Sequence, residues 1–249
     1  MSKLRIAAME GDVCRVSTLL EADEFRPYDA PPELEDQAEA LLLAAARGHQ
    51  SVVETLLGAG APVNRVFPGG SALHAAVMGD YPDVVELLLK AGAEPDLTDR
   101  QLGDRQQGWT ALMYAACYGR TSIAHLLVRA GAQADLPDRD GQTPLMVAAN
   151  AGHTAVALLL LEAGAKLQAR DYYGNTPLAC ALAHDTEGVS LAKSLADRAQ
   201  VNLDALDPIS TAAPYRVITH AKLRPWNWGS FPAAEDPNPS PSAAIAQMP

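Results

Sequence analysis

The side chains that could do chemistry in this sequence are its three cysteines and six histidines. Cys14, Cys117 and Cys180 lie far apart, so they fit neither a zinc site nor a disulfide framework. None of the histidines is paired with a cysteine or an acid at the spacing of metal ligands; they are His49, His74, His125, His153, His184 and His220. The spacing therefore predicts no metal site.

Cys117 is the one thiol that could act as a nucleophile, because its position in the sequence suggests partial exposure. A nucleophilic thiol needs a neighbouring base, and the sequence places none beside Cys117. Neither a phosphate-binding Gly-x-x-x-x-Gly-Lys-Ser/Thr run nor a Gly-x-Gly-x-x-Gly run before a helix occurs. We therefore expect no cofactor and no enzymatic activity. Catalysis would require residues that the fold brings together from distant parts of the chain.

Charge is distributed unevenly along the chain, whose formal net charge is -11. Residues 1–100 carry 8 Lys/Arg against 17 Asp/Glu, and the segment 21–39 holds eight acids and the single base Arg26. An acidic surface repels phosphate backbones, so we expect no nucleic-acid partner. The segment has two interpretations: a solvated acidic loop, or a landing site for a basic partner.

The 48% share of hydrophobic residues is typical of a folded chain. Aromatic residues are scarce at 5% while Ala and Leu are plentiful, which favours closely packed helices over sheets. The apolar runs 40–46 and 155–161 are too short to cross a bilayer, so we expect no membrane insertion. The first twelve residues are interrupted by charge, unlike a secretory signal. Together with the scarce cysteines, this predicts a reducing, cytoplasmic location.

The decisive feature is an internal repeat. Residues 108–140 and 141–173 are each 33 residues long and align without a gap. Looser copies start near residues 2, 39, 70 and 174, which makes six units. Each unit carries an apolar face that only its neighbours can cover, so the period predicts an elongated stack with local contacts.

The unit 141–173 shows how the sequence specifies its local structure. Thr143 stands where an N-cap is needed, and Pro144 occupies the first helical position. The small residues Ala148 and Ala149 allow a neighbouring helix to approach closely. Gly152 can adopt the left-handed conformation that ends a first short helix before a second one begins.

The recurring Thr-Pro-Leu, Ala-Ala, Gly-His, Leu-Leu-Leu and Gly-Ala elements resemble the ankyrin repeat over residues 2–204. The resemblance implies an all-α solenoid of stacked helix-turn-helix units with β-turn fingers. It divides the chain into an ankyrin-repeat domain at 1–204, an aromatic capping or motif segment at 205–232, and a disordered tail at 233–249. The final stretch has no periodic apolar face and is rich in proline.

Two departures from the family pattern are informative. The family usually has a histidine after Thr-Pro-Leu that ties turns together, and only His74 keeps it; Leu42, Met113, Met146 and Ala179 replace it elsewhere. We expect a weaker network of hydrogen bonds between turns as a result. Extra residues at 22–39 and 101–107 are expected to lengthen loops on the finger side, either as binding elements or through plain drift in loop length.

The resemblance also implies that partners bind at the turn tips and on the concave side of the first helices. The positions it indicates lie mainly in units four to six; they are Gln107, Trp109, Cys117, Tyr118, Arg139, Asp140, Gln142, Asn150, Tyr172, Tyr173, Asn175 and His184, with Arg47 and Met78 as counterparts upstream. The aromatic residues among them are typical of interface hot spots. The alternative is that these rings pack against adjacent turns and stiffen the stack.

The aromatic segment 205–232 includes Trp226 and Trp228 and has two interpretations. It either caps the exposed face of the last unit or forms a short motif that a second protein recognises. For the whole chain we predict a protein-interaction scaffold or adaptor, monomeric alone. The alternatives are a regulatory subunit that inhibits a partner enzyme and a self-associating structural protein.

Overall fold

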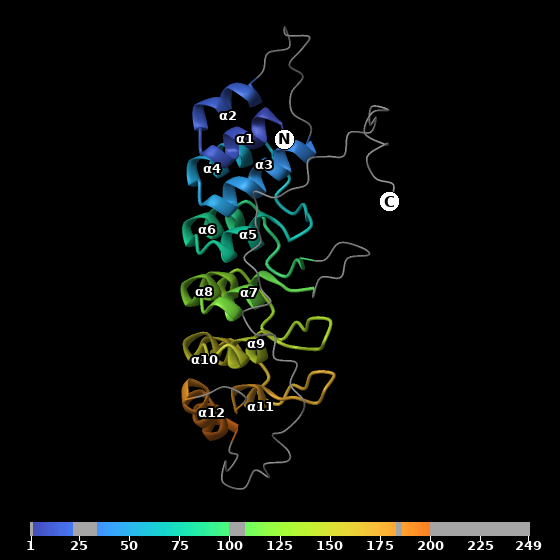
Figure 1. Ribbon diagram of the computed structural model, residues 1–249, viewed down its shortest axis with the longest axis vertical. Coiled ribbons are helices and arrows are strands. Elements are labelled where there is room, and N and C mark those ends of the chain that lie inside the picture. Colours follow the sequence, from blue (N-terminus) through green and yellow to red (C-terminus); the bar gives the residue numbers. More distant parts are fainter. Residues whose placement is uncertain (1, 22–33, 100–107, 183–185, 200–249) are drawn as a thin grey trace, which may run out of the picture.

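The chain forms an elongated column of helix pairs, shown with its first pair at the top in Figure 1. The computed structural model describes residues 2–21, 34–99, 108–182 and 186–199. In this part of the chain twelve helices form six pairs, each consisting of a first helix and a second helix. We call the segment that joins the second helix of one pair to the first helix of the next a finger.

The first helices follow one another along the column and contact their neighbours in order. They are α1 (Lys3–Glu10), α3 (Leu34–Arg47), α5 (Ala72–Met78), α7 (Ala111–Tyr118), α9 (Pro144–Asn150) and α11 (Pro177–Leu182). The second helices form a parallel row; they are α2 (Val13–Leu20), α4 (Gln50–Gly58), α6 (Pro82–Lys90), α8 (Thr121–Arg129), α10 (Thr154–Glu162) and α12 (Thr186–Ala199). The predicted all-α solenoid is confirmed.

The helix boundaries follow from the local signals in the sequence. The Thr143 hydroxyl accepts a hydrogen bond from the backbone N–H of Met146 at 3.4 Å, and Pro144 is the first residue of α9. Gly152 has a φ of 75°, the left-handed conformation predicted for it. These caps satisfy backbone groups that a short helix leaves without partners.

Alanine pairs bring the first helices together. Ala115 and Ala116 of α7 and Ala148 and Ala149 of α9 are all fully buried. With so little side chain between them, neighbouring backbones can approach closely, and the leucines of the second helices close the core from one side.

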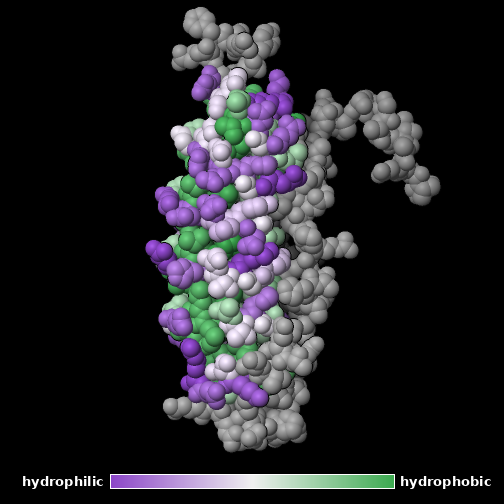
Figure 2. Space-filling model, turned by 90° about the vertical axis from the view of Figure 1, so that its left-hand side faces the viewer, coloured by the Kyte–Doolittle hydropathy of each residue, from purple (hydrophilic) through white to green (hydrophobic). Residues whose placement is uncertain are grey.

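The face built by the second helices is shown in Figure 2. Hydrophilic side chains recur along its whole length, with hydrophobic side chains visible between them. None of the helices in the described residues is long and apolar enough to cross a membrane.

Helix α3 corrects one expectation. It begins at Leu34, so residues 34–39 of the predicted acidic loop are helical. The guanidinium of Arg5 in α1 lies 2.6 Å from the carboxylates of both Asp36 and Glu39, and Arg65 lies 2.9 Å from Glu35. Acids in a first helical turn also interact favourably with the positive end of the helix dipole. The first helix of the second pair therefore begins upstream of position 39, and the start of the repeat unit itself stays a prediction.

Several predicted features lie outside the described residues. These are most of both insertions, Gln107, His184, the segment 205–232 with Trp226 and Trp228, and the tail 233–249. The proposed division of the chain at 204 and 232 stays a prediction.

Candidate partner-binding surface

The finger between α8 and α9 is held by a buried aspartate. Oδ1 of Asp138 accepts hydrogen bonds from the backbone N–H groups of Asp140 at 2.9 Å and Gln142 at 2.8 Å. Gly141 completes the turn with a φ of 80°. The side chain of Asp138 thus fixes the turn from inside, and Arg139 and Asp140 occupy its tip.

The finger between α10 and α11 repeats this construction. Oδ1 of Asp171 accepts hydrogen bonds from the N–H groups of Tyr173 at 2.9 Å and Asn175 at 2.8 Å, and Gly174 has a φ of 83°. Oδ2 of Asp171 accepts a third bond from the side-chain amide of Asn175 at 2.8 Å. Tyr172 and Tyr173 occupy the tip.

The two fingers are joined directly. The backbone N–H of Tyr172 donates to the carbonyl oxygen of Asp140 at 2.9 Å. The Tyr172 ring covers Gly141 so closely that a Cβ there would lie 3.0 Å from its Cδ1 atom. The tips of neighbouring units therefore form one continuous, rigid surface.

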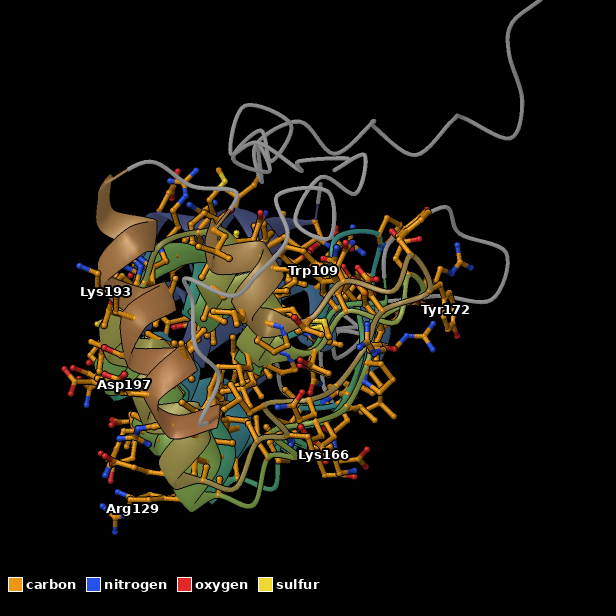
Figure 3. All side chains as sticks on the ribbon, turned by 90° about the horizontal axis from the view of Figure 1, so that it is seen from below. Trp109, Arg129, Lys166, Tyr172, Lys193 and Asp197 are labelled. Atoms are coloured by element: carbon orange, nitrogen blue, oxygen red, sulfur yellow. The ribbon has the colours of Figure 1, made fainter. Side chains whose placement is uncertain are left out.

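This surface exposes aromatic and basic side chains. Tyr172 is 79% exposed and Tyr173 is 59% exposed, and among the described residues only Leu34 joins them as an exposed large hydrophobic side chain. Figure 3 shows Tyr172 on the opposite side of the molecule from Lys193 and Asp197 of α12. Arg139 and Arg170 are exposed nearby, and Nη1 of Arg170 donates to the carbonyl oxygen of Gly174 at 2.9 Å.

Trp109 was expected on this surface, and that expectation is wrong. The side chain is only 3% exposed, and its indole N–H donates to Oδ2 of Asp138 at 3.0 Å. Its ring meets Tyr114 edge to face, with 5.2 Å between centroids. Trp109 therefore supports the finger from inside, as the alternative interpretation of the aromatic residues proposed.

His74 forms the predicted tie between turns. Its Nδ1 accepts a hydrogen bond from the Ser71 backbone N–H at 3.2 Å, so in the neutral ring Nε2 carries the proton and donates to the Trp109 carbonyl oxygen at 3.1 Å. Burial lowers the pKa of His74, although the nearby carboxylate of Asp99 acts in the opposite direction.

A buried carboxylate extends this network to the next helix. Asp99 accepts hydrogen bonds from the Trp109 backbone N–H at 2.9 Å and from the Tyr114 hydroxyl at 2.8 Å. Burial raises the pKa of Tyr114, so the phenol remains a proton donor. The main feature that the sequence did not predict is this buried network, which consists of His74, Asp99, Trp109, Tyr114 and Asp138. Its one signal in the sequence was the position of Asp138 shortly before the finger glycine Gly141.

This repeated construction agrees with known proteins. The family described as ankyrin repeats matches the chain at residues 4–99, 100–171 and 130–207. The chain belongs to the ankyrin-repeat family. It is also similar to "Ankyrin repeat and KH domain-containing protein mask-1" of Caenorhabditis elegans, with 37% identity over 128 residues. That match covers 49% of this chain and 4% of the relative, so the chain spans only a small part of that protein's length.

The ankyrin fold brings some predicted binding residues together and separates others. Arg139, Asp140, Gln142, Tyr172 and Tyr173 lie on the two joined fingers. Asn175, in contrast, is buried and bonded to Asp171, so its predicted exposure is wrong. The remaining described positions lie on the first helices: Arg47 is exposed, and Met78, Tyr118 and Asn150 are half-buried.

Tyr118 belongs to the same aromatic group as Tyr114. Their rings are nearly parallel, at 13°, with centroids 6.5 Å apart. Burial raises the pKa of Tyr118. This ring is therefore partly committed to the stack, and it lies on α7 rather than on a finger.

Cys117 is not the partly exposed thiol that the sequence suggested. It is buried at 6% exposure, and burial raises its pKa to about 12. A thiol in this setting carries almost no thiolate at neutral pH, which is the form that reacts as a nucleophile. Within the described part of the chain, no three His, Cys, Asp or Glu side chains are grouped so that they could hold a metal ion.

Proposed function

We propose that this chain is a scaffold or adaptor that binds a partner protein through its fingers and the concave side of its first helices. Ankyrin repeats are generally protein-protein interaction modules, and the chain belongs to that family. The observation that carries the proposal is the exposed pair Tyr172 and Tyr173 on a finger held by Asp171.

The rigidity of the fingers supports this proposal. Buried carboxylates hold both turns, so a partner meets side chains that are already in place. Little conformational entropy is then lost on association. Tyrosine also contributes a large contact area with few rotatable bonds, which explains its frequency among interface hot spots.

The remaining parts of the proposal follow from the family and from the chemistry of the site. Ankyrin repeats are generally non-enzymatic, and the raised pKa of Cys117 disfavours a catalytic thiol. We propose a cytoplasmic protein that is monomeric alone, binds no nucleic acid and does not insert into membranes. The net charge of -11 supports the exclusion of nucleic acid.

Site-specific photo-crosslinking tests this function. A photoreactive phenylalanine analogue at Tyr173 should crosslink to a partner protein in cells, because that side chain is exposed at the finger tip. The same analogue at Lys193, an exposed position in α12 on the opposite side, is the matched control. Equal crosslinking from both positions, or none from Tyr173, would contradict the proposal. An assay of the captured partner's activity then separates a scaffold from an inhibitor.

A further inference from the structure

The two aspartates that hold the fingers are buried, whereas the arginines that precede or follow them in sequence are exposed. Asp138 and Asp171 are buried, and each accepts three hydrogen bonds from the turn it holds or from a neighbouring side chain. Their charges are therefore offset by N–H dipoles inside the fold. The carboxylates of Asp138 and Asp171 therefore serve structure and are not presented to a partner.

The outward side chains are basic and aromatic. Arg139 and Arg170 are exposed, and within the described residues neither forms an ion pair. Asp140 is the only half-exposed acid at either tip. On a chain with a net charge of -11, this is a local positive surface that carries the two exposed tyrosines. We call Arg139, Arg170, Tyr172 and Tyr173 the finger patch.

We propose that the finger patch binds an acidic segment of a partner protein. This inference rests on the proposed function and specifies the chemistry of its partner. A guanidinium presents a planar set of donors that fits a carboxylate in a bidentate manner. The tyrosine rings supply apolar area beside these charges.

Arg170 is already oriented for such a contact. One of its terminal nitrogens is bonded to the Gly174 carbonyl oxygen, which fixes the guanidinium beside the Tyr172–Tyr173 turn. A guanidinium has five N–H donors, and the others make no hydrogen bond to the described residues. When Arg170 binds a carboxylate, its side chain therefore loses less conformational entropy than a freely moving arginine would lose.

Charge decides between the classes of partner. The exposed arginines would repel a basic segment, so an acidic segment fits this end of the stack. Tyrosine and arginine can also stack on single-stranded bases. The net negative charge of the chain opposes a phosphate backbone, which carries a charge at every nucleotide, more strongly than a short protein segment with a few carboxylates. The acidic protein segment is therefore favoured, and RNA becomes an outcome of the test.

Peptide display on the full-length chain tests the inference. Short random peptides selected on the immobilised protein should be enriched in Asp and Glu. An enriched peptide is then synthesised with a fluorescent label and its Kd is measured by anisotropy. We expect Arg139→Glu and Tyr172→Ala each to weaken binding about tenfold. The matched control is Arg129→Glu, at the exposed end of α8, which should change the Kd by less than about twofold.

Four outcomes would overturn the inference: no enriched peptide, enrichment without acids, unchanged binding by the finger variants, or tighter binding of labelled oligouridylate at the same residues. The crosslinking from Tyr173 separates this failure from failure of the proposed function. If a protein is crosslinked to Tyr173 through a segment without acids, the proposed scaffold function stands and only the proposal of an acidic partner segment fails.

Discussion

At the scale of single residues, Trp109 shows how one donor stabilises a finger. Its indole N–H gives the buried carboxylate of Asp138 its third hydrogen bond, and the other two come from the turn itself. An acceptor buried at 6% exposure cannot recover that bond from bulk water. The hydrogen bond of the indole N–H therefore contributes to stability in addition to the apolar area that the ring buries.

We predict that Trp109→Phe lowers the free energy of unfolding by about 1–3 kcal/mol, the cost of leaving a buried acceptor unsatisfied. Phenylalanine keeps an aromatic ring against Tyr114 and removes the donor. Urea denaturation measures the change. The control is Tyr172→Phe, which removes a polar group from a side chain that is 79% exposed and should have almost no effect. Equal stability of the two variants would show that the indole hydrogen bond contributes nothing.

His74 makes stability depend on pH. Its pKa is lowered in the folded state by burial, so below the ordinary histidine pKa the unfolded chain binds more protons than the folded chain. Stability from this residue is therefore present above about pH 6.5 and is lost as the pH falls. We expect the urea midpoint of the wild type to fall more between about pH 7.5 and about pH 5.5 than that of His74→Gln. Parallel pH profiles would assign the dependence to other groups.

At the scale of elements, the turn from first to second helix joins neighbouring units. Gly119 has a φ of 68°, and the ring of His153 from the next unit lies against it. Nε2 of His153 also lies 3.0 Å from the Cys117 carbonyl oxygen. His49 repeats the arrangement over Gly11. The histidine of each of these Gly-His pairs therefore contacts the corresponding glycine of the preceding unit.

We predict that Gly119→Ala destabilises the protein by more than about 1–2 kcal/mol, the cost of a left-handed backbone for a residue with a Cβ. The new Cβ would also lie 2.7 Å from Nδ1 of His153, which adds a displaced ring to that cost. The control is Gly58→Ala at the end of α4, where a Cβ meets nothing within 4 Å. That substitution should change stability by less than about 1 kcal/mol. Thermal unfolding of both variants measures the difference, and equal losses would contradict it.

The elements also show which parts of the structure the sequence could predict. The cap at Thr143 and the glycine at 152 act within a few residues of their own position, so their roles were predicted correctly. The start of α3 depends on Arg5, about one repeat upstream, whose ion pairs hold Asp36 and Glu39. The burial of Trp109 depends on Asp138, 29 residues later. Contacts between units determine both the start of α3 and the burial of Trp109. The sequence pattern within one unit does not specify such contacts.

At the scale of the whole molecule, the stack has chemically different ends. The acids of α3 are paired with Arg5 and Arg65. These ion pairs neutralise much of the negative charge that the described residues of the segment 21–39 carry. Burial also raises the pKa of Glu39, with Arg5 acting against it. The opposite end carries the finger patch, where the arginines have no such partners among the described residues. Selectivity for a partner should therefore arise at the C-terminal units.

The stability of a solenoid is approximately a sum over units and the interfaces between neighbours, so a break at one interface should affect the two sides unequally. Asp138 links Trp109 to the finger between α8 and α9, and Asp138→Ala removes that link. The pairs α9/α10 and α11/α12 then depend on a weakened interface, while the interfaces among the helices from α1 to α6 are unchanged.

We predict that hydrogen exchange in Asp138→Ala accelerates at least severalfold in α9–α12 and little in α1–α4, since amide exchange reports the free energy of local opening. Asp83→Ala, an exposed acid in the first turn of α6, is the control and should leave both regions unchanged. Uniform acceleration along the column would mean that the stack opens as one cooperative unit, and that the buried network does not divide its stability.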